Sequence, residues 1–242
     1  MKKYILSFGT KEYYGSLKLL GMSSIGMVDK AILCTESSLD QNFISANEKI
    51  FYQPRGFGYW LWKPYLINEM FKYAQHGDMI AYCDSASVIT SPLNNLFELC
   101  EKNDDILLFE NMNGSYDKPW INKDWTKIDC FNLMNCRGEK YTDGKQVDAA
   151  FQVYKKTEKT VKFVNEYLEF CQDENILTDA PNITGQNFES FIDHRHDQSV
   201  LSLLAIKYGV NLESCPSQWR ISNENEKFPI SFFHHKQKLV DA

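Results

Sequence analysis

Short runs of strand-forming residues alternate with longer amphipathic stretches along most of this chain of 242 residues. Strands that are joined through helices form a mostly parallel sheet whose faces are covered by those helices. The predicted strands are residues 3–8, 31–35, 49–53, 79–83, 106–109 and 147–155, and the predicted helices are 64–75, 125–134, 198–208, one opened by Ser91 and Pro92, and one capped by Thr157. The sequence therefore predicts an α/β protein with a mostly parallel central sheet flanked by helices.

A single domain, residues 1–242, is expected. The hydrophobic fraction of 43% is enough to fill one core at this length. No internal repeat, low-complexity tract or linker rich in proline and glycine divides the chain. Residues 110–146 are polar and irregular around one short helix, which in a compact domain indicates a functional or mobile loop.

The charge distribution argues against a nucleic-acid partner. The formal net charge is -6, and the 26 Lys and Arg residues are scattered rather than clustered. A nucleic-acid-binding surface would present a basic patch. A ligand that carries phosphate would therefore have to be held by a few positioned cations or by one metal ion.

Cysteine usage and hydropathy predict a cytoplasmic protein. The seven cysteines are odd in number and form no C-x-x-C pair, so buried reduced thiols are expected rather than disulfides or a zinc site. The N-terminal apolar run breaks at Ser7 and Gly9, and no segment approaches the roughly 18 apolar residues of a membrane span. Peripheral contact with the inner face of the membrane stays open.

Asp84 directly follows the apolar run from Met79 to Cys83. In an α/β sheet the carboxyl ends of the strands open onto the crevice in which ligands bind. A carboxylate at such a strand end can hold Mg²⁺ or Mn²⁺ against a diphosphate. The alternative is that Asp84 only starts a turn through its side-chain oxygen.

The stretch from residue 55 to residue 64 combines two glycines, two cations and the start of a helix. The glycines allow a ligand to approach the backbone closely, and Arg55 and Lys63 beside a helix N-terminus suit phosphate groups. Trp60 and Trp62 either offer flat faces to a sugar or pack in the core.

Polar and ionisable side chains open an otherwise apolar helix at residues 194–199. Asp197 could be the N-cap of that helix, a position that favours Asp. A cap does not require the histidines and the arginine that flank it, so a functional role for Asp197 is an equally concrete hypothesis.

The C-terminal tail contains Phe232 and Phe233 followed by two histidines. Chain ends usually fray. Because two adjacent phenylalanines resist exposure to water, we expect the tail to dock and to carry His234 toward the site.

These stretches together resemble the nucleotide-sugar glycosyltransferases of the GT-A fold, of the kind that build bacterial and viral surface glycans. The matching segments are Gly58 to Pro64, Asp78 to Ala86, Val147 to Tyr154 and His194 to Ser202. The resemblance implies a nucleotide-binding half at about residues 1–110 and an acceptor-side half at about residues 111–242.

In such enzymes an Asp-x-Asp motif at a strand end holds a divalent metal, and a C-terminal histidine completes the shell. Asp84 matches the first aspartate, whereas Ala86 stands at the place of the second. The resemblance thus implies Mn²⁺ or Mg²⁺ on Asp84 and His234, with weak or absent metal dependence left open because a carboxylate is missing.

The resemblance also assigns catalytic and donor-binding residues. Asp197 is implied as a general base or as an anchor for the acceptor hydroxyl, and Asp148 matches the strand beside the donor sugar. The implied donor-binding residues are Phe8, Gly9, Thr10, Arg55, Tyr59, Trp60, Lys63, Asp84, Ser85, Ala86 and Gln198.

The implied function is transfer of a sugar from a nucleoside-diphosphate donor, expected to be a UDP-sugar, to a glycan or glycolipid acceptor, as in surface polysaccharide synthesis. One alternative is a catalytically inactive module on the same scaffold that binds a sugar or nucleotide. The loss of the second aspartate of the motif at Ala86 would fit such a loss of activity. The other is a metal-dependent phosphohydrolase, since clustered Asp and His residues also build hydrolytic sites.

Overall fold

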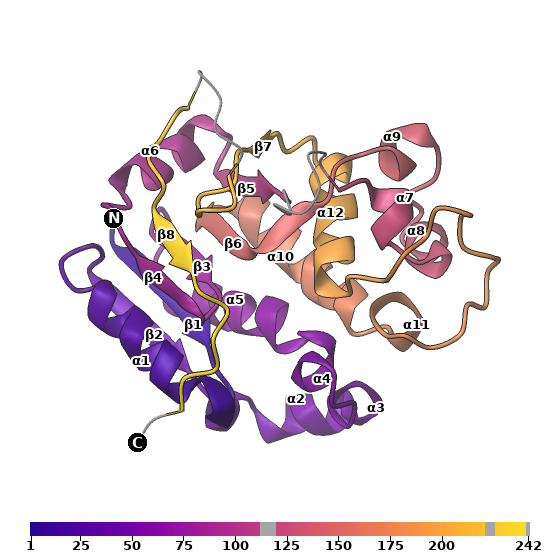
Figure 1. Ribbon diagram of the computed structural model, residues 1–242, viewed down its shortest axis with the longest axis horizontal. Helices are drawn as coiled ribbons and strands as arrows, with labels where there is room; N and C mark the ends of the chain where they lie inside the picture. Colours follow the sequence, from indigo (N-terminus) through magenta and orange to yellow (C-terminus); the bar gives the residue numbers. More distant parts are fainter. Residues whose placement is uncertain (112–119, 221–225, 241–242) are drawn as a thin grey trace.

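The computed structural model describes residues 1–111, 120–220 and 226–240 and is built around a six-stranded sheet (Figure 1). In spatial order its strands are β2 (Lys30–Cys34), β1 (Lys3–Phe8), β3 (Met79–Cys83), β6 (Val147–Lys155), β5 (Ile106–Glu110) and β7 (Leu212–Glu213). Strand β6 pairs antiparallel with both of its neighbours, whereas the other pairings are parallel. In this six-stranded sheet of the described residues, five strands therefore point one way and β6 the other, which confirms the predicted α/β class.

The helices lie on both faces of this sheet. They are η1 (Lys11–Tyr13), α1 (Tyr14–Ser23), η2 (Glu36–Ser38), α2 (Gln41–Ala46), α3 (Glu48–Phe51), α4 (Gly56–Tyr59), α5 (Trp62–Tyr73), α6 (Asn94–Lys102), α7 (Asn122–Trp125), α8 (Ile128–Leu133), α9 (Glu139–Thr142), α10 (Glu158–Cys171), α11 (Glu174–Leu177) and α12 (Asp197–Lys207). The predicted helix at 125–134 is thus two short helices, and residues 112–119 of the predicted irregular region lie outside the described residues.

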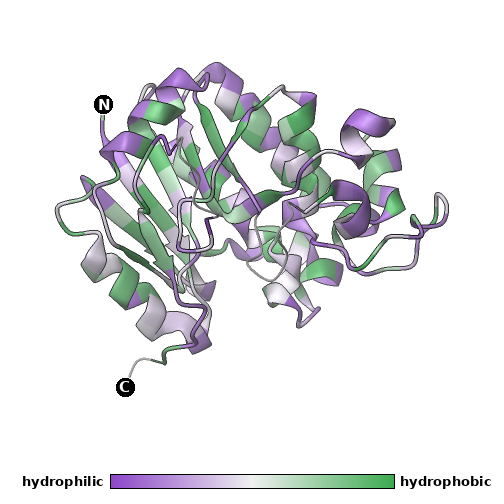
Figure 2. Cartoon of the chain, turned by 45° about the horizontal axis from the view of Figure 1, so that its top comes forward, coloured by the Kyte–Doolittle hydropathy of each residue, from purple (hydrophilic) through white to green (hydrophobic). Residues whose placement is uncertain are grey.

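Each face of the sheet has its own hydrophobic core, and alternate residues along a strand pack into one core or the other. Along β3, Ile80 and Tyr82 pack in the cluster that contains α5, α10 and α12. Met79 and Ala81 point the other way and pack with α1 and α6. The period of two residues is that of a strand buried on both faces, and Figure 2 shows the sheet carrying mainly hydrophobic residues.

Two sequence-based expectations are corrected. Residues 49–53 are not a strand, because α3 covers residues 49–51 and, of its side chains, buries only that of Ile50, at 2% exposure. Strand β6 is not reached by a crossover. The chain leaves β5 at Glu110 and re-enters the sheet at Val147, its register partner, so the long segment between them returns to the same sheet edge and forces antiparallel pairing.

The C-terminal tail docks, as predicted. Strand β8 (Phe232–His234) pairs antiparallel with β4 (Ser87–Ile89) in a second, two-stranded sheet (Figure 1). Phe232 is 1% exposed, and its ring stacks on that of Phe151 with centroids 4.8 Å apart. Phe233 is 49% exposed, so only one of the two phenylalanines anchors the tail.

The seven cysteines are free and buried, as expected. Their thiols serve as small core side chains. None of the helices in the described part of the chain is both long enough and apolar enough to cross a membrane.

Replacing Phe232 by alanine is expected to lower the free energy of unfolding by about 3–5 kcal/mol, because it leaves a cavity beside Phe151. The matched substitution Phe233→Ala should change it by less than about 1 kcal/mol, since that side chain is half exposed. Urea unfolding followed by circular dichroism measures both. Equal losses in the two variants would contradict the docking of the tail through Phe232.

Candidate active site

A cavity of about 240 Å³ lies where β3 ends and β6 begins. The antiparallel register brings these two ends together, since the backbone N–H of Asp84 donates to the carbonyl of Ala150 at 3.0 Å. Helix α12 begins at the same place with Asp197. The predicted site residues that line the cavity are Arg55, Trp60, Lys63, Asp84, Asp148, Asp197, Gln198 and His234. Both predicted halves of the chain contribute to it.

Other predicted residues do not line this cavity. They are Phe8, Gly9, Thr10, Tyr59, Ser85 and Ala86. The ring of Phe8 stacks on that of Trp62 with centroids 4.2 Å apart, so both aromatic side chains belong to the core. The contact of Phe8, Gly9 and Thr10 with the donor stays a prediction.

The ammonium group of Lys63 is the centre of the site. It lies 3.4 Å from Oδ1 of Asp84 and 3.2 Å from Oδ2 of Asp197, and it donates to the carbonyl of Ala149 at 3.2 Å. Burial by itself lowers the pKa of Lys63, but the charges of Asp197 and Asp84 more than offset this and raise the pKa above its ordinary value. Lys63 is therefore a permanent buried cation whose neighbours are already in place, not a free phosphate ligand.

Asp197 is tied into the same cluster. Its carboxylate is 5% exposed, pairs with Lys63 and accepts a hydrogen bond from the hydroxyl of Tyr167 at 3.1 Å. Burial is the main cause that raises its pKa. Its carboxylate contacts are thus with Lys63 and Tyr167, and the first turn of α12 carries no side-chain cap. The simple N-cap alternative is wrong.

Asp148 has a different environment, with no cation within ion-pair distance among the described residues. Its Oδ1 accepts from its neighbour's backbone, the N–H of Ala150, at 3.0 Å. Burial raises its pKa to about 6, and the nearby charge of Asp84 acts in the same direction. Because the residue also lines the cavity, it is a carboxyl group that exchanges a proton near neutral pH within reach of a ligand.

Asp84 and His234 approach the cavity from β3 and from the docked tail. Asp84 accepts a hydrogen bond from the hydroxyl of Tyr82 at 2.6 Å and neighbours Lys63. Burial lowers the pKa of His234, which keeps its imidazole neutral near pH 7. The backbone of His234 is fixed by Gln218, whose amide both donates to its carbonyl and accepts from its N–H at 2.8 Å.

This donor set does not fit a divalent cation held by the protein alone. The carboxylate of Asp84 already serves Tyr82 and Lys63, and position 86 is alanine. Over the described ranges, no group of three His, Cys, Asp or Glu side chains could hold a metal ion. The metal implied by the family resemblance on Asp84 and His234 therefore lacks the ligands that such a site needs.

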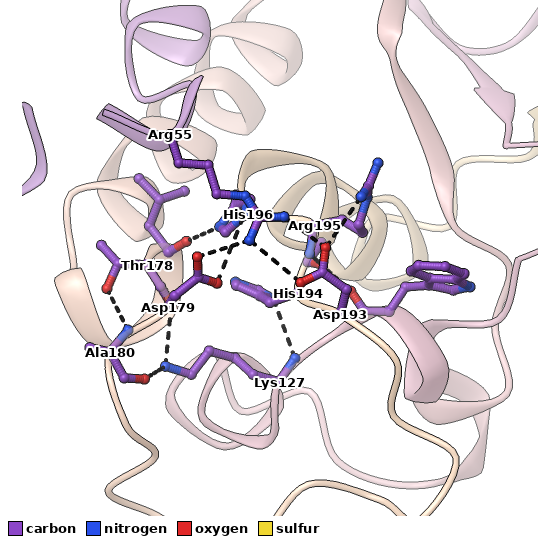
Figure 3. Close-up of polar contacts among 12 residues, drawn as sticks. Arg55, Lys127, Thr178, Asp179, Ala180, Asp193, His194, Arg195 and His196 are labelled. Atoms are coloured by element: carbon purple, nitrogen blue, oxygen red, sulfur yellow. Dashed lines mark hydrogen bonds and ion pairs between the residues drawn. The ribbon is translucent and has the colours of Figure 1, made fainter. Parts of the chain in front are cut away.

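Arg55 is also engaged inside the protein. Figure 3 shows its guanidinium between two carboxylates, 2.9 Å from Asp179 and 2.7 Å from Asp193. The hydrogen bond to Asp193 is the main cause that raises the pKa of Arg55. The side chain thereby fastens the irregular segment before α12 to the turn that precedes α5, and its predicted contact with phosphate would have to compete with these pairs.

An unusual turn presents this region to the cavity. The residues from Gly56 to Trp60 all have positive φ, between 51° and 79°, and form one left-handed helical turn. Glycine tolerates this conformation, but the three residues of other types each cost roughly 1–2 kcal/mol. The turn ends with the indole of Trp60 stacked on the ring of His196, 5.6 Å between centroids, at the cavity wall.

His196 lines the cavity as a neutral group. Its Nδ1 is 2.8 Å from the carbonyl of Leu177, which makes Nδ1 the donor. Burial lowers its pKa to about 4. Its φ of 56° is strained for a residue other than glycine, and its buried Nε2 has no hydrogen-bond partner among the described residues.

The structure adds residues that sequence reasoning missed. The guanidinium of Arg195 lies over the stacked rings of Trp120 and Trp125, at 5.1 and 5.7 Å from their centroids. The ammonium of Lys236 lies 4.5 Å from the ring centroid of Trp219. Arg195, Trp120, Lys236 and Trp219 all line the cavity. The partners in these cation–aromatic pairs are far apart in the sequence, so no periodic pattern of residues predicts them. Arg195 does lie in the polar stretch at residues 194–199 that stands out in the sequence.

No protein-family model matches the sequence, and no curated protein does. Among solved structures, mouse xyloside xylosyltransferase 1 in its apo form is similar, with a TM-score of 0.52 and 10% identity over 96% of this chain and 97% of that one.

Two further structures are more distant. The apo bifunctional glycosyltransferase WbbM aligns with 84% of this chain and 37% of its own, at TM-score 0.48 and 12% identity. The apo-form glycosyltransferase GlyE of Streptococcus pneumoniae TIGR4 aligns with 89% of this chain and 46% of its own, at TM-score 0.42 and 14% identity. The chain spans less than half the length of these two. The near full-length match to the xylosyltransferase shows the fold, and the chain has the GT-A-like fold of nucleotide-sugar glycosyltransferases.

Replacing Lys63 by methionine is expected to lower the free energy of unfolding by about 3–5 kcal/mol, because it leaves Asp84 and Asp197 without their cation. Adding Asp197→Asn should recover part of the loss. Lys72→Met is the matched control on the same helix. That lysine is exposed and pairs with Glu69, so its loss should cost less than about 1 kcal/mol. Urea unfolding at pH 7 measures all four proteins, and an unchanged Lys63→Met midpoint would refute the buried cluster.

Proposed function

We propose that this chain is a glycosyltransferase that moves a sugar from a nucleoside-diphosphate donor, expected to be a UDP-sugar, to a hydroxyl group of a glycan or glycolipid. The observation that carries the proposal is the cavity at the strand ends, in which Asp148, with its pKa of about 6, lies beside the Lys63 cluster. The GT-A-like fold supports the same class of reaction. Ligands of open α/β sheets bind at this edge.

Asp148 is proposed as the carboxylate that acts on the reacting groups. Sugar transfer requires a group that takes the proton of the attacking hydroxyl, or one that stabilises positive charge at the anomeric carbon. A carboxyl group whose pKa is about 6 is mostly ionised at pH 7 and remains a competent base. The proposal holds for either stereochemical outcome at the anomeric carbon.

Asp197 is proposed as a positioning residue. Its carboxylate holds Lys63 and Tyr167, and these contacts leave it 5% exposed. Lys63 in turn donates to the carbonyl of Ala149, next to Asp148. The cluster thus fixes the backbone that carries the proposed base. The adjacent Gln198, which also lines the cavity, donates to Gln146 at 2.9 Å and is left as a donor-binding candidate.

Asp148→Asn is expected to lower kcat at least about 100-fold with little change in donor KM, the range for removal of a general base. The asparagine keeps an oxygen for the N–H of Ala150. Transfer or slow donor hydrolysis is measured with labelled UDP- and GDP-sugars over a panel of glycan acceptors. Asp143→Asn is the matched control, because that carboxylate is exposed and pairs with Lys123 outside the cavity. Wild-type kcat in Asp148→Asn would remove Asp148 from the mechanism.

The pH dependence follows from the raised pKa of Asp148. Because the base must be ionised, wild-type kcat/KM should rise as the pH increases through about 6. The folded-state pKa lies above the ordinary value of 3.8, so the folded protein binds the proton more tightly and loses stability as the pH rises from about 4 to about 6. Asp148→Asn should flatten that slope in unfolding experiments across this range.

The same assays distinguish the two alternative functions. Donor binding without turnover across the whole acceptor panel would indicate an inactive sugar- or nucleotide-binding module. Cleavage of phosphoesters that contain no sugar would indicate a phosphohydrolase. Such an enzyme would need a metal cluster, and the described side chains offer no group of three ligands for one.

A further inference from the structure

The sheet end of the cavity contains more negative than positive charge. Three carboxylates, those of Asp84, Asp148 and Asp197, line it, and Lys63 is the cation paired with two of them. A diphosphate would bring further negative charge to this place. Its binding, as the proposed function requires, therefore needs positive charge that is not already neutralised inside the protein.

The cations that line the cavity differ in how far they are engaged. Lys63 is 3% exposed and surrounded by its two carboxylates and a carbonyl. Arg55 pairs with Asp179 and Asp193. Arg195 shares Asp193 at 3.4 Å and stacks on two indoles. For Lys236, no carboxylate lies within ion-pair distance in the parts of the chain that the structure describes, so its ammonium is the cation most open to a ligand.

Backbone hydrogen bonds of the docked tail hold Lys236 at this wall. The backbone N–H groups of His235 and Lys236 both donate to the carbonyl of Ala86, at 2.9 and 3.3 Å. The φ of Lys236 is 58°, a left-handed conformation that lysine adopts at a cost. Lys236 thus stands against the very position where an Asp-x-Asp motif would place its second carboxylate.

Trp219 provides a second group at the same wall. Its ring lies under the ammonium of Lys236, and its buried indole N–H has no hydrogen-bond partner among the described residues. A buried donor without a partner is costly unless a ligand supplies an acceptor. A cation and an unpaired N–H donor on the same cavity wall suit the oxygens of a phosphate group.

We propose that Lys236, together with the indole N–H of Trp219, binds the diphosphate of the donor in place of a divalent metal ion. This inference rests on the proposed function. The ammonium offsets part of the negative charge of the diphosphate in the bound donor, and part of the additional negative charge that develops on the leaving nucleoside diphosphate as the glycosidic bond breaks. The binding of nucleoside diphosphates is therefore independent of added metal.

The test is isothermal titration of the full chain with UDP, GDP, inorganic pyrophosphate and uridine, in buffer with EDTA and in buffer with Mn²⁺. The wild-type protein should bind UDP with the same affinity in both buffers. Lys236→Met should weaken the binding of UDP and pyrophosphate about 10- to 100-fold, the range for a hydrogen bond to a charged group. The affinity for uridine, which lacks the diphosphate, should be the same in Lys236→Met and in the wild-type protein.

Two further variants separate charge from structure. Lys236→Arg should keep most of the affinity, because it keeps the positive charge. Lys238→Met should bind UDP like the wild type, since Lys238 is exposed, pairs with Glu12 and does not line the cavity. Thermal unfolding of each variant shows whether the tail remains docked.

The outcomes discriminate between the inference and the proposed function. UDP binding that is lost in EDTA and restored by Mn²⁺, or wild-type affinity in Lys236→Met, would overturn the role of Lys236. Metal-independent binding that Lys236→Met weakens, without sugar transfer to any acceptor, would support the inference and reject the enzymatic function. If no nucleoside diphosphate binds in either buffer, both proposals are wrong.

Discussion

The buried ammonium group of Lys63 connects the parts of the molecule that build the site. It joins α5, which carries it, to Asp84 at the end of β3, to Ala149 in β6 and to Asp197 at the start of α12. Removing one partner from such a buried cluster leaves uncompensated charge, which costs several kcal/mol. The cavity therefore exists only while these four elements keep their relative positions, and its chemistry is tied to the stability of the fold.

A second set of ion pairs closes the other wall. Arg55 links the left-handed turn before α5 to Asp179 and Asp193, in the irregular segment that leads into α12 (Figure 3). Lys127 holds the same segment through the carbonyl of Ala180 at 2.7 Å. A segment with so little regular structure depends on side-chain contacts for its position. Arg55 and Lys63, the two cations for which the sequence predicted contacts with phosphate, also hold these parts of the protein together.

Much of the fold could be read from local patterns, because strands and helices leave periodic signals. Strand β6 covers residues 147–155 as predicted, and α10 begins directly after its predicted cap, Thr157, whose side chain accepts from the N–H of Thr160. The direction of β6 could not be read in this way, since direction depends on where the preceding loop returns. The strand predicted at residues 49–53 was wrong because a short apolar run fits a helix and a strand equally well.

By itself the sequence determined the class of fold and the stretches that meet at the cavity, because a carboxylate after a buried strand and a polar start to an apolar helix are local features. The role of each side chain was decided by the tertiary structure. Asp148 and Asp197 are both acidic residues near the site. Asp148 has no cation within ion-pair distance in the described part of the chain and has a pKa of about 6, whereas Asp197 pairs with Lys63. Lys236 reaches the same cavity from the chain's far end. Burial and charge pairing set the chemistry of an ionisable group, and both arise from residues far apart in the sequence.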